Sequence, residues 1–239
     1  MIYQCYFDKR QQASIFSEEP YRGFGLEINV NKKLFFNCPE LEDSSTRKQL
    51  TEYSAFLWHW RNKFLNPDSW IGFTSYRQLE KFPHVFKTKQ EIESLLSTHG
   101  IVGWGQYELH GNDSRLIPLS EQADICHPGL NEYIEDIFRL FEHPIPSAWY
   151  SQSTAFFANY WVMPLDLFDR FMEFSWPMVK WSLENIKDSN FYKMQHEYGT
   201  VTNEKAIGYF MERLFILWHL SNNISSVNPS KIQPLGHNR

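Results

Sequence analysis

The chain alternates short apolar runs with longer stretches in which apolar residues recur every three or four positions. The runs are typical of buried strands and cover residues 2–7, 34–36, 155–163 and the first half of 70–78, and the loosely alternating residues 101–109 predict a further strand. The longer stretches predict amphipathic helices over residues 44–64, 89–98, 130–141, 164–186 and 203–220, with a kink or break before Pro177. Strands that alternate with helices in this way predict an α/β fold, whose mostly parallel sheet is covered by helices on both faces.

Two polar segments interrupt this pattern. Residues 110–127 predict a long polar loop, and loops of such length in compact domains are usually functional or mobile. Residues 225–239 are polar, contain two prolines and predict a loosely held tail. We therefore expect a single domain over residues 1–224, followed by that tail.

The stretch 70–78 is the best candidate for a functional site. It is apolar in its first half and turns polar at Thr74, Ser75, Tyr76 and Arg77. Ligands of open α/β sheets bind beyond the carboxyl ends of the strands, so this strand end predicts side chains delivered to a site. The alternative is an ordinary strand and loop in which Arg77 forms a structural ion pair.

The last predicted helix carries a second candidate, the neighbours Glu212 and Arg213. This helix has two apolar faces and is expected to be largely buried, where a charge must be paired or used. Adjacent residues point about 100° apart around a helix, so the two side chains need not pair with each other. The alternative is a buried pair that ties the helix to the sheet.

Composition narrows the class of protein. The net charge is −5 and no basic face is concentrated, which argues against nucleic-acid binding. The three cysteines are widely spaced and form no C-x-x-C pair, which favours a reducing compartment. No apolar run is long enough to span a bilayer, and residues 1–8 do not resemble a signal peptide. These features predict a soluble cytoplasmic protein.

Several catalytic and nucleotide-binding motifs are absent from the sequence. It contains neither G-x-G-x-x-G nor G-x-x-x-x-G-K-[ST], so the dinucleotide-binding and P-loop classes lack support. It also lacks H-E-x-x-H and G-x-S-x-G, and its nine histidines form no recognisable ligand ladder. No Asp-x-Asp occurs, so the sequence carries no signature of a carboxylate-pair metal site at a strand end.

Four blocks, in order, resemble a bacterial polysaccharide-type glycosyltransferase family marked by an H-Y-R-R strand end. Residues 52–62 (E-Y-S-A-F-L-W-H-W-R-N) resemble the family's E-L-T-A-x-Y-W-x-W-K-N helix, and residues 71–78 resemble I-G-L-x-H-Y-R-R. Residues 159–169 resemble N-M-F-I-M-x-x-x-L-F-D, and residues 208–214 resemble G-F-x-x-E-R-L. The resemblance implies a GT-A-like fold that binds a nucleotide sugar and transfers the sugar to a growing glycan.

The resemblance also implies a donor side of the site. Arg77 would contact the donor diphosphate, which suits a planar and permanently charged guanidinium, and Ser75 and Tyr76 would flank it. Glu52 would lie towards the donor side, as would Asp8 at the end of the first predicted strand. A solvated turn explains Asp8 equally well.

On the acceptor side, the resemblance implies that Glu212 is the catalytic base or a sugar-binding carboxylate, steered by Arg213. Asn159 would hydrogen-bond the donor or acceptor sugar, and His127 is similar to a family histidine that precedes the helix at 130. The alternatives are that Asn159 satisfies backbone groups at the strand end and that His127 caps the following helix.

The sequence departs from the family pattern at two positions. The family histidine is Ser75 here, and the second arginine is Gln78, so positive or metal-binding capacity is lost from the expected phosphate site. The alternative function is therefore a non-catalytic glycan- or nucleotide-binding relative. Mn²⁺ or Mg²⁺ stays open as a cofactor, although we favour donor binding without a tightly held divalent ion. The expected partners are a nucleotide sugar and a glycan acceptor, with membrane contact only through a lipid-linked acceptor.

Overall fold

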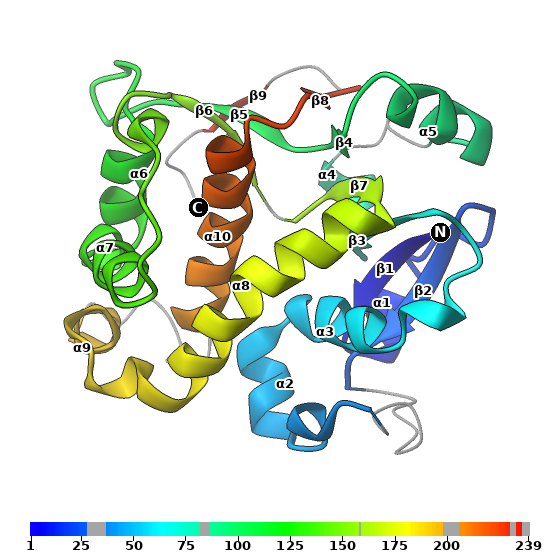
Figure 1. Ribbon diagram of the computed structural model, residues 1–239, viewed down its shortest axis with the longest axis horizontal. Coiled ribbons are helices and arrows are strands. Elements are labelled where there is room, and N and C mark those ends of the chain that lie inside the picture. Colours follow the sequence, from blue (N-terminus) through cyan, green and yellow to red (C-terminus); the bar gives the residue numbers. More distant parts are fainter. Residues whose placement is uncertain (28–36, 82–86, 158, 198–205, 230–232, 236–239) are drawn as a thin grey trace.

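The structure, a computed structural model, describes residues 1–27, 37–81, 87–157, 159–197, 206–229 and 233–235. A six-stranded sheet with the order β2-β1-β3-β7-β4-β8 lies at its centre (Figure 1). Its strands are β1 (Ile2–Tyr6), β2 (Tyr21–Gly25), β3 (Trp70–Ser75), β4 (Ile101–Gly103), β7 (Trp161–Pro164) and β8 (Ser226–Val227). Strand β7 is antiparallel to β3 and β4, and the other described pairs are parallel. The prediction of an α/β fold with a mostly parallel sheet is confirmed.

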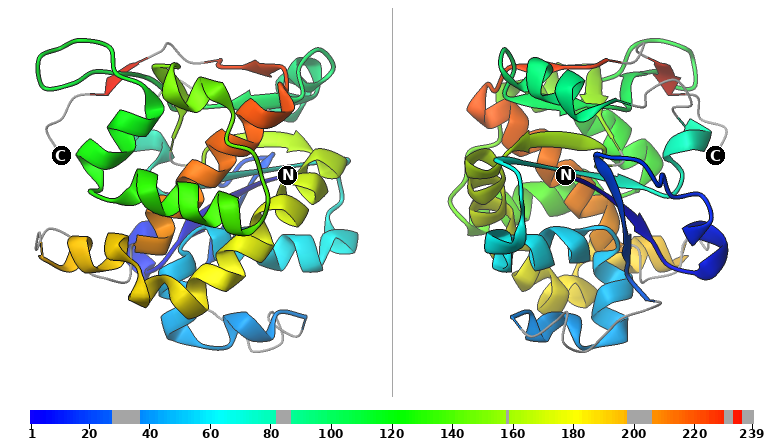
Figure 2. Two further views of the ribbon diagram at one scale, coloured as in Figure 1. Left: turned by 60° about the vertical axis from the view of Figure 1, so that its left-hand side comes forward. Right: turned by 90° about the vertical axis from the view of Figure 1, so that its right-hand side faces the viewer.

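Helices surround this sheet. They are α1 (Lys9–Gln12), α2 (Ser44–Leu50), α3 (Tyr53–Arg61), α4 (Gln78–Lys81), α5 (Lys89–Leu96), α6 (Leu119–Cys126), α7 (Leu130–Leu140), α8 (Leu165–Asn185), α9 (Asn190–Glu197) and α10 (Ala206–Asn222). Short 3₁₀ helices are η2 (Pro39–Leu41), η3 (Lys63–Leu65), η4 (Ser147–Tyr150) and η5 (Ile186–Asp188). Helices α8 and α10 lie side by side against the sheet (Figures 1 and 2). None of the helices described is long and apolar enough to cross a membrane.

The central sheet has an apolar core on each face, because successive side chains of a strand point to opposite faces. Phe73 and Trp161 face the larger core, which also holds the buried residues of α3, α8 and α10. Trp70 and Val162 face the smaller core, which contains Ile92 from α5. Burial on both faces explains why these strands are apolar runs instead of alternating patterns.

Two predicted strands are each divided between two sheets. The run 101–109 forms β4 and then β5 (Gln106–Leu109), and the run 155–163 forms β6 (Thr154–Phe156) and then β7. Strands β6, β5 and β9 (Gln233–Leu235) make up a second sheet. The divisions fall at Gly105 and Asn159, whose φ angles of 76° and 54° are incompatible with a continuous strand.

Two helix predictions are wrong in detail. The segment 44–64 is broken between α2 and α3, because Thr51 has a φ of 47° and ends α2. In contrast, α8 continues through Pro177 without the expected break. Its buried residues lie on both sides of the proline, among them Met172 and Val179, so packing on the core holds the helix together there.

The two polar segments also contain regular structure. Helix α6 occupies the second half of the expected loop 110–127. In the expected tail, β8 pairs with β4 and β9 pairs with β5, so these parts of residues 225–239 belong to the two sheets. The predicted strand at 34–36 lies outside the described residues.

Candidate functional site

The carboxyl ends of β1 and β3 lie at one edge of the central sheet, next to the start of the antiparallel strand β7. The register places Cys5 beside Ser75, and Phe73 beside Trp161. Residues 75–77 leave the sheet at this edge, and residues 159–160 enter it there. The edge is the position at which open α/β sheets bind ligands.

Ser75 and Tyr160 form the buried part of this edge. Their hydroxyl groups are hydrogen-bonded to each other, and the backbone N–H of Arg77 donates to Ser75 Oγ over 3.2 Å. Burial, to which the Glu52 carboxylate adds, raises the pKa of Tyr160, so the phenol keeps its proton. Ser75 therefore serves to position the turn that carries Arg77.

Arg77 forms a two-pronged ion pair with Glu80 in α4. Its Nε lies 3.0 Å from Glu80 Oε2 and its Nη2 lies 2.6 Å from Oε1, and this pairing raises the pKa of the guanidinium. The Arg77 side chain is 37% exposed. The ammonium of Lys81 lies 5.3 Å from the centre of the Tyr160 ring. Two cations and one carboxylate thus follow β3 directly.

Asp8 and Tyr76 are held at this edge by local contacts. The Asp8 carboxylate caps α1 by accepting the backbone N–H groups of Arg10 and Gln11 over 2.7 and 2.9 Å. This is the solvated-turn role that the sequence left open for it. The backbone N–H of Tyr76 donates to the carbonyl of Cys5 over 2.9 Å, which fixes the end of β3 beside β1.

Glu52 lies at the junction of α2 and α3. Its charge adds to burial in raising the pKa values of both Cys5 and Tyr160, which places the carboxylate near the ends of β1 and β7. A Cβ added at Gly208 would lie 3.9 Å from Thr51, so the first turn of α10 passes close to the same junction.

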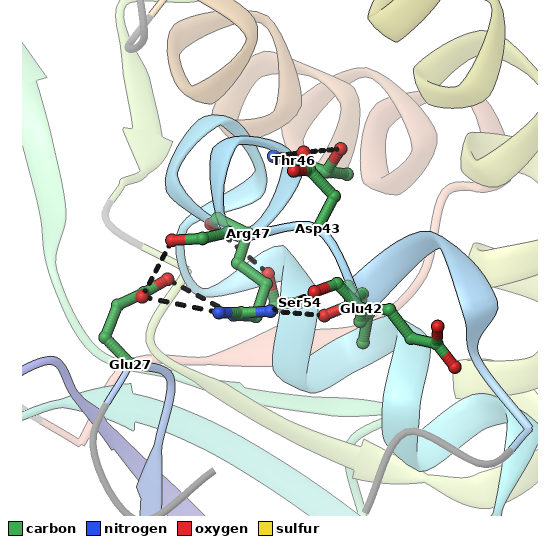
Figure 3. Close-up of polar contacts among 8 residues, drawn as sticks. Glu27, Glu42, Asp43, Thr46, Arg47 and Ser54 are labelled. Carbon is green, nitrogen blue, oxygen red and sulfur yellow. Dashed lines mark hydrogen bonds and ion pairs between the residues drawn. The ribbon is translucent and has the colours of Figure 1, made fainter. Parts of the chain in front are cut away.

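A polar network around Arg47 fixes the α2–α3 junction (Figure 3). The buried Arg47 Nη1 donates to the carbonyls of Leu41 and Glu42 over 2.6 and 3.0 Å, and Nε donates to Glu27 over 3.2 Å. Asp43 caps α2 by accepting the N–H of Thr46 over 2.7 Å. The network links Glu27, which follows β2, to α2. Glu52 closely follows α2, so the network helps to fix its position.

Glu212 and Arg213 form an ion pair with 2.7 Å between Arg213 Nη1 and Glu212 Oε2. Nη2 of Arg213 donates to Gln122 Oε1 over 2.9 Å, and the guanidinium lies 4.7 Å from the centre of the Phe157 ring. The two neighbours do pair, as in the alternative left open by the sequence, and Gln122 and Phe157 hold the long arginine side chain where it reaches back to Glu212. The Arg213 side chain is 2% exposed and that of Glu212 is 23% exposed, so the carboxylate stays accessible.

His127 stacks on Tyr209, with 3.5 Å between the ring centres and 17° between the planes. Burial, aided by the charge of Arg213, lowers the pKa of His127 to about 3, so the ring is neutral. Its Nδ1 has no hydrogen-bond partner among the residues described. The side chain does not cap α7, which begins after Gly129, although the His127 carbonyl accepts the N–H of Leu130 over 2.9 Å.

Asn159 lies in the sequence between a residue that contacts Arg213 of α10 and a residue that bonds to the end of β3. Two residues before it, Phe157 contacts Arg213, and directly after it Tyr160 bonds to Ser75. Three peptide units span at most about 11 Å, so the backbone at the two contacts is at most that far apart. Phe157 and Tyr160, three residues apart in the sequence, thus connect Arg213 of α10 with Ser75 at the end of β3.

Sequence reasoning missed several members of this site. Tyr160 was part of an apolar strand prediction, and Gln122 lay in the expected loop 110–127. Tyr209 was given no role, and it precedes Glu212 by three residues, a spacing that puts both on one side of α10. Among the described residues, no three His, Cys, Asp or Glu side chains are grouped closely enough to hold a metal ion.

Comparisons with known proteins support the fold. Neither a family model nor a curated protein sequence matches the chain. Among solved structures it is similar to one described as the WbbM bifunctional glycosyltransferase in its apo form, with a TM-score of 0.50 and 16% identity. The match covers 95% of this chain and 44% of that one, so this chain spans less than half of that protein. The chain is a mixed α/β domain with the fold of part of a glycosyltransferase structure.

Proposed function

We propose that this chain is a glycosyltransferase that moves a sugar from a nucleotide-sugar donor to a glycan acceptor, such as a growing polysaccharide or surface glycan. One observation carries the proposal. Arg213, the partner of Glu212 in α10, contacts Phe157, and three residues later Tyr160 bonds to Ser75 at the cationic end of β3. The likeness in fold to a solved glycosyltransferase supports the same class of reaction.

The donor diphosphate binds, in this proposal, at the end of β3. Arg77 is partly exposed and exchanges Glu80 for the diphosphate, since a guanidinium binds phosphate oxygens with the same two-pronged geometry. Lys81 lies next to it and adds a second positive charge. These two cations stabilise the negative charge that develops on the leaving diphosphate.

Glu212 acts as the base in this proposal. Glycosyl transfer to a hydroxyl requires that its proton be removed, and a carboxylate within hydrogen-bond reach accomplishes this. Arg213 holds one carboxylate oxygen, which orients the group towards the acceptor hydroxyl. Asn159 lies in the sequence between Phe157, which contacts Arg213, and Tyr160, which bonds to Ser75, and is proposed to hydrogen-bond the transferred sugar.

The test of the proposed function is a thermal-shift panel on the native protein. Nucleoside diphosphates and nucleotide sugars are added with Mn²⁺, with Mg²⁺ and with EDTA. A ligand that binds only the folded state raises the melting temperature by mass action. We expect stabilisation by at least one nucleoside diphosphate and its sugar conjugates, including in EDTA. Stabilisation that depends wholly on Mn²⁺ would contradict the metal-independent donor site, and no stabilisation by any nucleotide would contradict the function.

A non-catalytic binding protein is the second candidate. The observation in its favour is that Arg77 and Glu212 are each already engaged in an ion pair. Such a protein would be stabilised by a nucleotide or a glycan in the same panel, but it would release no nucleoside diphosphate from a bound nucleotide sugar.

A further inference from the structure

A hollow lies beside the far half of α10, away from the Glu212–Arg213 pair. It is a cavity of about 170 Å³ between α10 and the antiparallel strands β5 and β6. By this measure one water molecule needs only about 10–15 Å³, so the cavity has room for a ligand larger than a few waters. Neither the donor site nor the base described above uses it.

The described lining of the cavity contains no Asp, Glu, Lys or Arg side chain. It offers amides from Gln106 and Gln152, hydroxyls from Thr154 and Ser226, and apolar surface that includes the Phe156 ring. Burial lowers the pKa of His219, which also lines the cavity, so its imidazole is neutral. Such a surface disfavours phosphates and carboxylates, because nothing compensates for their loss of water.

Neutral hydrogen-bonding groups beside an aromatic ring suit an uncharged polyhydroxyl ligand. Amide and hydroxyl groups donate to and accept from sugar hydroxyls, and ring faces pack against the apolar C–H surface of a sugar. His219 Nε2 is buried and has no hydrogen-bond partner within the described part of the chain.

The position of the cavity relates it to the proposed site. His219 follows Glu212 by seven residues, which places it about 10 Å further along the same side of α10. The end of β6 also relates the two sites: Phe156 lines the cavity, and the next residue, Phe157, contacts Arg213. A short glycan chain spans such a distance.

We infer that this cavity binds a neutral sugar residue of the acceptor glycan, about two helical turns from the reacting hydroxyl. That the sugar belongs to an acceptor rests on the proposed function. The cavity would be a sugar site separate from the donor site, and sugar binding there would not require the donor. It predicts that the protein recognises more of the acceptor than the sugar that reacts.

Saturation-transfer NMR on the full chain tests the site directly. The probes are the methyl glycosides of glucose, galactose, mannose and N-acetylglucosamine. We expect at least one to bind, with or without a saturating nucleoside diphosphate. Gln106→Leu and Thr154→Val remove hydrogen-bonding groups at similar size and should weaken that binding by about two- to tenfold. Gln90→Leu makes the same change at an exposed position on α5 and should leave binding unchanged.

A photoreactive diazirine derivative of the bound glycoside covers the case in which the variants do not fold. Peptide mass spectrometry of the native protein should find the label on residues 152–156 or 215–220. Labelling elsewhere, or the absence of binding by every neutral glycoside, overturns the cavity assignment. Glycoside binding without any nucleotide binding would retain the sugar site and overturn the transferase proposal, so the two failures are distinguishable.

Discussion

At the scale of single residues, the site consists of charges that are already paired. Arg77 is held by Glu80, and Glu212 by Arg213, so neither charge faces the solvent without a partner. Pairing keeps a charged side chain in one geometry before a ligand arrives. The two pairs differ in burial, because the guanidinium of Arg213 is enclosed whereas that of Arg77 is partly exposed. Only the exposed pair is suited to exchange its partner for a ligand.

If Arg77 exchanges Glu80 for the diphosphate, substitutions of Arg77 and of Glu80 should have opposite effects on nucleotide binding. Arg77→Ala should weaken nucleoside-diphosphate binding roughly 10- to 100-fold, the effect of losing a hydrogen-bonded charge. Glu80→Gln should leave binding intact or tighten it, because it removes the competing carboxylate. The free energy of unfolding of both variants should lie within about 1 kcal/mol of the native value, since exposed ion pairs contribute little to stability. Titration calorimetry on both variants provides the comparison, and equal weakening by the two would contradict the exchange.

His127 predicts a specific dependence of stability on pH. Its folded pKa of about 3 lies below the value of about 6.5 in the unfolded chain, so between these values only the unfolded state binds the proton. Stability should therefore fall as the pH drops from about 6.5 towards 3, by at most about 1.4 kcal/mol per pH unit from this group. His127→Phe keeps a ring against Tyr209 and should flatten that slope.

Denaturant unfolding at several pH values measures this slope. His59→Phe serves as a matched comparison, because burial also lowers the pKa of His59 well below its ordinary value. The two substitutions should each reduce the slope. An NMR titration in which the His127 ring of the folded protein protonates near pH 6.5 would show that the ring is not buried as described.

At the scale of elements, the site depends on breaks in regular structure. Thr51 separates α2 from α3, and Gly105 and Asn159 separate the central sheet from the second one. Each break has a positive φ and redirects the chain beside the site: Glu52 follows Thr51, and Tyr160 follows Asn159. A straight helix or an unbroken strand would carry these side chains away from the edge.

The break at Thr51 predicts a stabilising substitution. A β-branched residue with φ of 47° and ψ of −129° is strained, whereas glycine adopts these angles freely. Thr51→Gly should raise the free energy of unfolding by about 1 kcal/mol after the entropic cost of glycine. Thr46→Gly in the first turn of α2 is the control and should lower it, since glycine disfavours helix. A loss of stability in Thr51→Gly would show that side-chain contacts outweigh the strain.

These breaks also mark the limit of prediction from the sequence. Hydrophobic patterns correctly indicated β1, β3, α5, α7 and α10, because burial of a sheet face or a helix stripe leaves a periodic signal. The same signal ran across Asn159 and Thr51, since apolar residues lie on both sides of each. Whether the chain turns there depends on contacts with distant elements, such as the bond from Tyr160 to Ser75, that no local pattern contains.

At the scale of the whole molecule, the contacts of Phe157 and Tyr160 link α10 to the end of β3. Arg77, Asn159 and Glu212 stay predicted site residues: the polar end of a strand indicated Arg77, a buried helix and the resemblance indicated Glu212, and the resemblance alone gave Asn159 its role. The sequence did not indicate Gln122, whose helix α6 lies in a polar segment without a clear period. The ion pair between Glu212 and Arg213 was left open as an alternative, and its geometry depends on Gln122 and Phe157 from other elements.

The central claim is that Glu212 removes a proton during sugar transfer from a nucleotide donor. The most direct measurement is the release of nucleoside diphosphate from the nucleotide sugar that stabilises the native protein, with glycan acceptors and with water alone. The comparison is between the native protein and Glu212→Gln, which keeps the shape of the side chain but removes its charge. The account predicts that the variant folds, keeps the donor-induced thermal shift and releases the diphosphate about 100- to 10,000-fold more slowly. Equal release by the two proteins, or none by a native protein that binds the donor, would contradict it.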